Sequence, residues 1–287
     1  MSQVTVKCCR YTSVLALLCV LSPVLYAQVI EYAMTENVTA TADYHPGKRD
    51  TAIVIVHGFL TTRNFRTVYH LSNALLDEGY TVLAPTLSLG VSRRKISLAC
   101  EAIHTHSIDD DIREIQYWVD WLVAKKYKKI MMVGHSFGSL EILLYQLRYK
   151  NPVVKGLVAT SLIGVGRAES KAGQLQIAAA KKMLAHGDNK LGEFQLSYCK
   201  KYIAPPKAFL SYAVWDRKRI LSAINKTHVP FSVILGGADK RMDNGWLDAL
   251  KKHGVRLKII KGANHFFDAL FEFDLLDSVL ASLGTDR

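Results

Sequence analysis

Residues 129–144 read KIMMVGHSFGSLEILL and join a short apolar run to an apolar helical pattern through a glycine-flanked serine. The run at 130–133 is typical of a strand that is buried on both faces of a sheet. The leucines that follow recur at helical spacing, so a helix is expected to begin within about three residues of Ser136. Gly134 and Gly138 carry no side chain that would block so close an approach of strand and helix. The stretch therefore predicts that Ser136 lies at the tip of a very tight strand-to-helix turn.

The hydroxyl of Ser136 would then lie beside a helix N-terminus. Free backbone N–H groups and the helix dipole favour the negative charge that develops there during acyl transfer. Chance alone would produce Gly-x-Ser-x-Gly about 0.1 times in a chain of this length. Most chance matches would lack the buried strand and the helix that the motif requires. We therefore take Ser136 as a candidate nucleophile, with a purely structural tight turn as the alternative.

Strand and helix patterns alternate along most of the chain. The expected strands are 37–44, 52–56, 80–84, 130–133, 153–161, 230–235 and 255–261. The expected helices are 64–78, one that begins at Ser107, one that follows Ser136, 246–253 and 268–283, the last with Leu270, Phe273, Leu276 and Leu280 facing inward. Such alternation predicts an α/β fold with a doubly wound, mostly parallel sheet.

Two long segments interrupt the alternation. Residues 163–228 are rich in helix formers, are broken by Pro205 and Pro206, and are interpreted as a helical cap inserted into the sheet order. Residues 85–106 show no clear periodicity, which is unusual in a compact domain and suggests a segment that lines the mouth of a pocket. A length of 287 residues, of which 49% are hydrophobic, suits one domain with such an insertion.

Residues 1–27 differ in pattern from the rest of the chain. Basic residues precede the apolar run 14–21, and the small residue Ala27 follows it. This is the pattern of a signal peptide that is cleaved after Ala27 and leaves a domain of residues 28–287. An uncleaved anchor is the alternative, although the apolar run is short for a bilayer span. We expect a secreted or periplasmic protein.

Removal of residues 1–27 would leave two cysteines, Cys100 and Cys199. In an exported protein an even pair is a candidate disulfide, which here would tie the segment before Ser107 to the insertion. Two separate buried thiols are an equally good interpretation, because the sequence contains no information on the distance between them.

The chain is basic, with a formal net charge of +12 at pH 7. Much of the excess lies in lysine pairs on expected helix faces, which are usually solvated surface. A weak contact with an anionic membrane surface is compatible with this charge, whereas no motif points to nucleic acid. His104 and His106 lack a third ligand at short spacing, so neither a metal nor another cofactor is expected.

Chemistry-bearing residues follow four of the expected strands. They are His57-Gly58, Ser136, Asp239 and His265. The carboxyl ends of parallel strands meet at one edge of a sheet, and open α/β sheets bind their ligands there. The chain order Ser, Asp, His and the motifs GHSFG, GGAD and GANH resemble the α/β-hydrolase superfamily, from about Asp50 to the C-terminus.

This resemblance implies a Ser-His-Asp triad. Ser136 would be the nucleophile, and His265 would be the general base that takes its proton near neutral pH. Asp239 would accept the other ring proton of His265 and stabilise the imidazolium. Asp243 and Asp216 are possible substitutes for this acid.

The resemblance also implies an oxyanion hole made of two backbone N–H groups. One would belong to Phe137 and the other to Phe59, in the turn after His57, with Leu60 as the alternative to Phe59. Each such donor is worth ~3 kcal/mol of barrier. Neither His57 nor His135 is our choice for the base, because the first is expected to support the turn and the second to pack beneath the serine.

Taken together, these residues predict an exported serine hydrolase that cleaves carboxylic esters or thioesters through an acyl-enzyme, similar to carboxylesterases or lipases. Its substrate would be a small acyl ester or a lipid-like molecule. An acyltransferase with the same triad is the first alternative, and a non-catalytic binding protein on this fold is the second. Many members of the superfamily carry an aspartate and a glycine run where this chain has APTL at 84–87, so the substrate class is left open.

Overall fold

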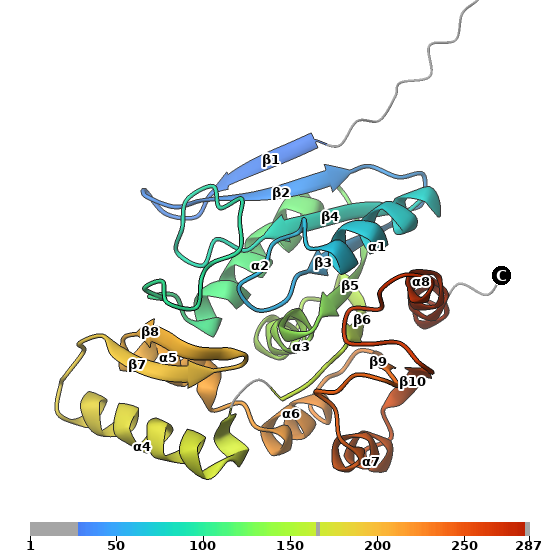
Figure 1. Cartoon of the computed structure of the whole chain (residues 1–287). Coiled ribbons are helices and arrows are strands. Elements are labelled where there is room, and N and C mark those ends of the chain that lie inside the picture. The colour runs from blue at the N-terminus through green and yellow to red at the C-terminus, as the bar shows by residue number, and fades with distance from the viewer. Residues whose placement is uncertain (1–27, 165–166, 285–287) are drawn as a thin grey trace, which may run out of the picture.

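The computed structural model describes residues 28–164 and 167–284. Within these ranges the main sheet has eight strands in the order β1-β2-β4-β3-β5-β6-β9-β10 (Figure 1). The strands are β1 (Gln28–Ala33), β2 (Thr39–His45), β3 (Thr51–Val56), β4 (Thr81–Thr86), β5 (Lys129–His135), β6 (Val154–Thr160), β9 (Phe231–Gly236) and β10 (Arg256–Ile260). In this order, every pair of neighbouring strands from β4 to β10 is parallel. The pairs β1–β2 and β2–β4 are antiparallel. The predicted mostly parallel sheet is confirmed; the proposed signal peptide, 1–27, lies outside the described residues.

Helices cover both faces of this sheet. On one face lie α1 (Arg66–Asp77) and α8 (Phe271–Ser282), and on the other lie α2 (Ile108–Ala124), α3 (Phe137–Tyr149), α6 (Arg217–Ile224) and α7 (Asn244–Lys252). Successive residues of a strand point to opposite faces, so Ile53 and Ile55 of β3 pack with α1 and α8, while Val54 and Val56 pack with α2 and α3. In the described part of the chain no helix is both long and apolar enough to span a bilayer.

The segment between β6 and β9 forms the predicted insertion. It contains η1 (Arg167–Glu169), α4 (Lys171–Ala185), β7 (Gly192–Leu196), β8 (Cys199–Ala204), α5 (Pro206–Ala213) and α6. Figure 1 shows most of it, in yellow, gathered at one end of the molecule. The expectation of an entirely helical insertion is wrong at 192–204, where β7 and β8 pair as an antiparallel hairpin. Its buried residues, such as Phe194 and Tyr202, are aromatic types that favour strands.

Two further elements differ from the sequence-based expectation. The edge strand β1 was not predicted, because it buries only Ile30 and so carries little periodic signal. Helix α8 was predicted. Of the residues expected to face inward, Leu280 is buried and Leu276 is partly buried, but Leu270 and Phe273 are 78% and 70% exposed, and Leu275 and Val279 are buried as well. Apolar residues occur on several sides of α8, so their spacing does not select the face that packs.

Candidate active site

Ser136 lies on the tight turn between β5 and α3. Its backbone has φ 54° and ψ −114°, a conformation that a non-glycine residue adopts at a cost of about 1–3 kcal/mol. A Cβ at Gly134 would collide with the backbone carbonyl of Gly138, and a Cβ at Gly138 would collide with that of Val56. The backbone N–H of Ser136 donates to the carbonyl of Thr160 at 2.7 Å. The predicted turn is confirmed, and the two glycines are required by close backbone contacts.

The structure brings together the three residues predicted for the triad. His265 Nε2 lies 2.9 Å from Ser136 Oγ, and His265 Nδ1 lies 2.6 Å from Asp239 Oδ2. An ionised carboxylate can only accept, so Nδ1 carries the proton and donates it to Asp239. The lone pair on Nε2 is then free to accept the hydroxyl proton of Ser136.

The two alternative acids have other partners. Asp243 forms an ion pair with Arg217 at 2.7 Å and caps the N-terminus of α7. Asp216 caps the N-terminus of α6 by accepting a hydrogen bond from the backbone of that helix at 2.7 Å. Asp239 is therefore the acid that contacts His265.

Hydrogen bonds hold the acid and the base in place. Burial by itself would raise the pKa of Asp239, but the hydrogen bonds from His265 and from the backbone N–H of Arg241 outweigh it and hold that pKa below its ordinary value. The hydroxyl of Ser161 donates to the backbone carbonyl of His265 at 2.6 Å. These contacts keep Asp239 ionised and oriented, and they hold the imidazole of His265 in place.

The turn after His57 lies against the nucleophile, as predicted. A Cβ placed on Gly58 would lie 3.4 Å from the Cβ of Ser136. Phe59 lines the same pocket as Ser136, and its ring lies edge-on to that of Phe137 at 5.6 Å. Among the described residues the N–H groups of Phe59 and Phe137 donate to no other group. Phe59 lines this pocket and Leu60 does not, so the placement favours Phe59.

His57 and His135 are buried and have structural partners. His57 Nε2 accepts from the backbone N–H of Leu87 at 3.0 Å, so its Nδ1–H donates to the carbonyl of Gly58 at 2.8 Å. Burial, followed by the charge of Arg94, lowers the pKa of His57 to about 3. Burial also lowers the pKa of His135 to about 3. Neither ring has a hydrogen bond to Ser136 in the described structure, so His265 remains the base.

A cavity of about 230 Å³ opens at Ser136. Much of its wall is formed by the aromatic side chains of Phe59, Phe65, Tyr198 and Phe266. Arg241 adds a cationic group to this wall. Residues 85–106 were expected to line the mouth of a pocket. None of them lines the cavity at Ser136, but Ser88, Gly90, Thr105 and His106 line a different cavity of about 220 Å³. Most of residues 90–103 are exposed, but Arg94 is buried, and its guanidinium donates to the carbonyls of Leu87, Leu60 and Thr61.

Comparison with known proteins agrees with this architecture. The family model for the alpha/beta hydrolase fold matches residues 51–188. This chain has the α/β-hydrolase fold. The matched range contains Ser136 but ends before Asp239 and His265. None of the curated proteins is a significant match in sequence.

Solved structures of α/β-hydrolases superpose over most of the chain. The esterase Est1E from Butyrivibrio proteoclasticus is 18% identical, with a TM-score of 0.60, over 90% of this chain and 99% of that one. The α/β-hydrolase GrgF from Penicillium sp. sh18 is 13% identical, with a TM-score of 0.67, over 90% and 98%. An esterase from Pyrococcus furiosus is 20% identical, with a TM-score of 0.62, over 90% of each chain. At these identities the similarity shows the fold.

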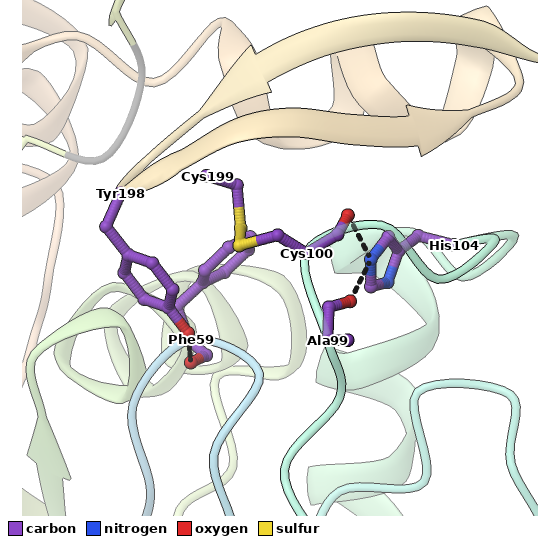
Figure 2. Close-up of a disulfide and its surroundings, with 6 residues drawn as sticks. All are labelled: Phe59, Ala99, Cys100, His104, Tyr198 and Cys199. Carbon is purple, nitrogen blue, oxygen red and sulfur yellow. Dashed lines mark hydrogen bonds between the residues drawn. A yellow bond between two sulfur atoms is a disulfide. The ribbon is translucent and has the colours of Figure 1, made fainter.

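The structure contains a disulfide between Cys100 and Cys199. The sequence left two separate thiols as an equal alternative, and the structure contains the bond. It joins the 85–106 segment to the start of β8, close to the pocket residue Tyr198 (Figure 2).

The sequence did not predict a group of buried acids in this α/β fold. Asp111 is 2% exposed and accepts a hydrogen bond from the hydroxyl of Tyr212 at 2.5 Å. Glu114 accepts from the backbone N–H of Ser88, and burial raises its pKa to about 7. Burial also raises the pKa of Glu141 well above its ordinary value. The signal was present, since Glu114 and Glu141 stand among apolar residues of their helices.

Proposed function

We propose that this protein is a serine hydrolase that cleaves carboxylic esters or thioesters through a covalent acyl-enzyme. The observation that carries the proposal is the hydrogen-bonded array from Ser136 to His265 at 2.9 Å and from His265 to Asp239 at 2.6 Å. Serine is a weak nucleophile unless a base takes its proton, and here a neutral imidazole lies within reach. The array stands at a pocket large enough for a small acyl group.

In the first half-reaction Ser136 Oγ attacks the carbonyl carbon of the substrate while its proton moves to His265 Nε2. The carbonyl oxygen becomes an oxyanion that accepts hydrogen bonds from the N–H groups of Phe59 and Phe137. Asp239 stabilises the imidazolium that has formed. Collapse of the intermediate breaks the bond to the alcohol or thiol, which leaves with the proton held by His265, and the acyl group stays on Ser136.

Water completes the cycle. It gives a proton to His265 Nε2 as its oxygen attacks the acyl carbon, and a second oxyanion forms in the same place. When this intermediate collapses, the bond to Ser136 breaks, and His265 returns the proton to the serine oxygen. The free acid then leaves, and the enzyme is restored.

The size and wall of the pocket favour small esters over long-chain lipids. A cavity of about 230 Å³ lined by several aromatic rings suits a short or aromatic acyl group. A structure of Est1E contains bound ferulic acid, and another structural neighbour is the thioesterase domain of a curacin biosynthetic pathway. We take both an aromatic ester and a thioester as candidate substrates.

Export belongs to the same proposal. The signal-like pattern at 1–27 and the disulfide between Cys100 and Cys199 both suit an oxidising compartment, so we place the protein in the periplasm or outside the cell. A weak contact of its basic surface with an anionic membrane stays a prediction from the net charge of +12.

A fluorophosphonate probe tests the proposal directly. It should label the wild-type protein and should not label a folded Ser136→Ala variant. p-Nitrophenyl esters of increasing chain length should be hydrolysed with a preference for short chains. A wild-type protein that is folded, unlabelled and inactive on every ester would favour a binding protein on this fold.

Product analysis with an added alcohol separates hydrolysis from acyl transfer, since both share the acyl-enzyme. A hydrolase releases mainly the free acid, whereas an acyltransferase releases mainly the ester of the added alcohol. We expect the free acid.

A further inference from the structure

Tyr198 connects the inserted segment to the turn that carries Phe59 (Figure 2). Its hydroxyl donates a hydrogen bond to the backbone carbonyl of Phe59 at 3.1 Å. Its ring meets the ring of Phe59 edge-on, with the centroids 5.7 Å apart and the planes at 81°. The next residue along the chain is Cys199, which is bonded to Cys100. Tyr198 is therefore held on one side by a covalent bond and holds Phe59 on the other.

The turn that Tyr198 contacts needs support. Leu60, which follows Phe59, has φ 56°, in the left-handed region, and such a conformation persists only when its surroundings hold it. The carbonyl of Leu60 accepts a hydrogen bond from the backbone N–H of Leu98 at 3.0 Å. Two consecutive carbonyls of the turn are thus bonded from outside, that of Phe59 by Tyr198 and that of Leu60 by Leu98.

The disulfide joins the two segments that provide this support. Leu98 lies two residues before Cys100, and Tyr198 lies one residue before Cys199. A fixed distance between the cysteines therefore limits how far the two donors can move apart. The N–H of Phe59 belongs to the peptide that precedes its Cα, and the bonded carbonyl belongs to the peptide that follows it, so the hydrogen bond and the ring contact of Tyr198 together restrain that Cα. Displacement of the Cα would move the N–H from the oxyanion position, and small displacements of such donors reduce catalysis strongly.

The same two segments also share contacts that do not depend on the disulfide. The backbone N–H of His104 donates to the carbonyl of Ile203 at 2.8 Å, and the ring of His104 stacks on Tyr202 with the centroids 4.2 Å apart. These contacts should keep the insertion attached when the disulfide is absent. Loss of the disulfide is therefore expected to loosen the turn without unfolding the protein.

We propose that Tyr198 is a positioning residue for the oxyanion donor Phe59, and that the disulfide between Cys100 and Cys199 holds Tyr198 in place, so that full turnover needs the oxidised protein. This inference rests on the proposed hydrolase function. Reduction by a dithiol breaks the sulfur–sulfur bond and leaves two thiols, while the two sulfurs of the dithiol form a disulfide of their own.

Tyr198→Phe tests the hydrogen bond and keeps the ring. We expect kcat on a short p-nitrophenyl ester to fall about tenfold while KM changes by less than about twofold, because one hydrogen bond that restrains the Cα of the donor residue is lost. Tyr202→Phe is the matched control. Tyr202 belongs to the same hairpin and its ring lies 6.0 Å from that of Phe59, but its hydroxyl has no hydrogen-bond partner among the described residues. Its kcat should equal that of the wild type.

The disulfide is tested by a double-mutant cycle. Cys100→Ser with Cys199→Ser, and the wild type after reduction with dithiothreitol, should each lose a similar part of kcat. Adding Tyr198→Phe to the serine pair should lower kcat little further, because both changes remove the same restraint on Phe59. Circular dichroism and thermal unfolding show whether each variant is folded under the assay conditions.

Several outcomes would overturn the inference. One is a Tyr198→Phe variant whose kcat equals that of the wild type, and another is full activity after reduction. A third is a triple variant whose loss of kcat equals the product of the losses in Tyr198→Phe and in the serine pair. The proposed function fails differently: the oxidised wild type would then neither hydrolyse esters nor react with a fluorophosphonate at Ser136. A wild type that is labelled and active, with Tyr198→Phe unchanged, refutes only the positioning role.

Discussion

Asp239 fixes the tautomer of His265, and its replacement should show this. Asp239→Asn offers an amide where the imidazole needs an acceptor, so we expect kcat to fall by roughly 10³-fold or more. Asp243→Asn is the control, because Asp243 is paired with Arg217 and caps α7. Its kcat should stay close to that of the wild type. Equal losses in the two variants, measured on p-nitrophenyl acetate, would mean that Asp239 has no special role.

Arg241 gives the aromatic pocket a positive charge. It lines the cavity with Ser136, and its guanidinium carbon lies 5.0 Å from the centroid of the Phe266 ring. We expect Arg241→Gln to lower kcat/KM for 4-acetoxybenzoate about fivefold, since exposed charge pairs contribute modestly. The neutral isostere 4-acetoxybenzamide should be unaffected. Lys240→Gln, at an exposed neighbour outside the pocket, should change neither rate. A similar loss on both substrates would contradict a charge effect.

At the scale of elements, α2 shows how a local signal sets a boundary. Ser107, where the sequence predicted that a helix begins, caps α2 in a capping box with Asp110. We expect Ser107→Ala to lower the free energy of unfolding by about 1 kcal/mol, while Ser107→Thr, which keeps a capping hydroxyl, should lower it much less. Urea unfolding with the disulfide intact measures both. Equal values for the two variants would show that the cap contributes nothing.

The hairpin β7–β8 and helix α8 mark where local signals were insufficient. The abundance of helix formers predicted a helical insertion, yet residues 192–204 pair as two strands, because Phe194 and Tyr202 are buried against the rest of the core. Helix α8 has apolar residues on several sides, and contact with α1 and the sheet selects the buried one. In both cases the choice depends on neighbours that are distant in the sequence.

At the scale of the whole molecule, the buried acids should make stability depend on pH. Burial raises the pKa of Glu114 from 4.5 to about 7, so the folded state keeps this proton over a range in which the unfolded state has lost it. The stabilisation is fully present below pH 4.5 and is lost as the pH rises through about 7. For Glu114 alone we expect a loss of free energy of unfolding on the order of 2–3 kcal/mol between pH 5 and pH 8.

Glu114→Gln removes the titrating group and can keep the hydrogen bond from Ser88. Its free energy of unfolding should therefore fall less steeply from pH 5 to pH 8, although Glu141 remains and acts in the same direction. Urea unfolding at several pH values compares the two slopes. The same slope in both proteins would show that Glu114 does not titrate in this range.

The sequence by itself determined what depends on neighbouring residues: the alternation of strands and helices, the tight turn at Ser136 and the exits of β9 and β10 where Asp239 and His265 stand. The tertiary structure alone decided which aspartate meets His265, whether Cys100 and Cys199 are bonded, and that Tyr198 reaches Phe59. Steric limits on backbone angles and side-chain periodicity act over a few residues and can be recognised in the chain. Contacts such as that between Tyr198 and Phe59, which are 139 positions apart, depend on how whole elements pack, which no short pattern encodes.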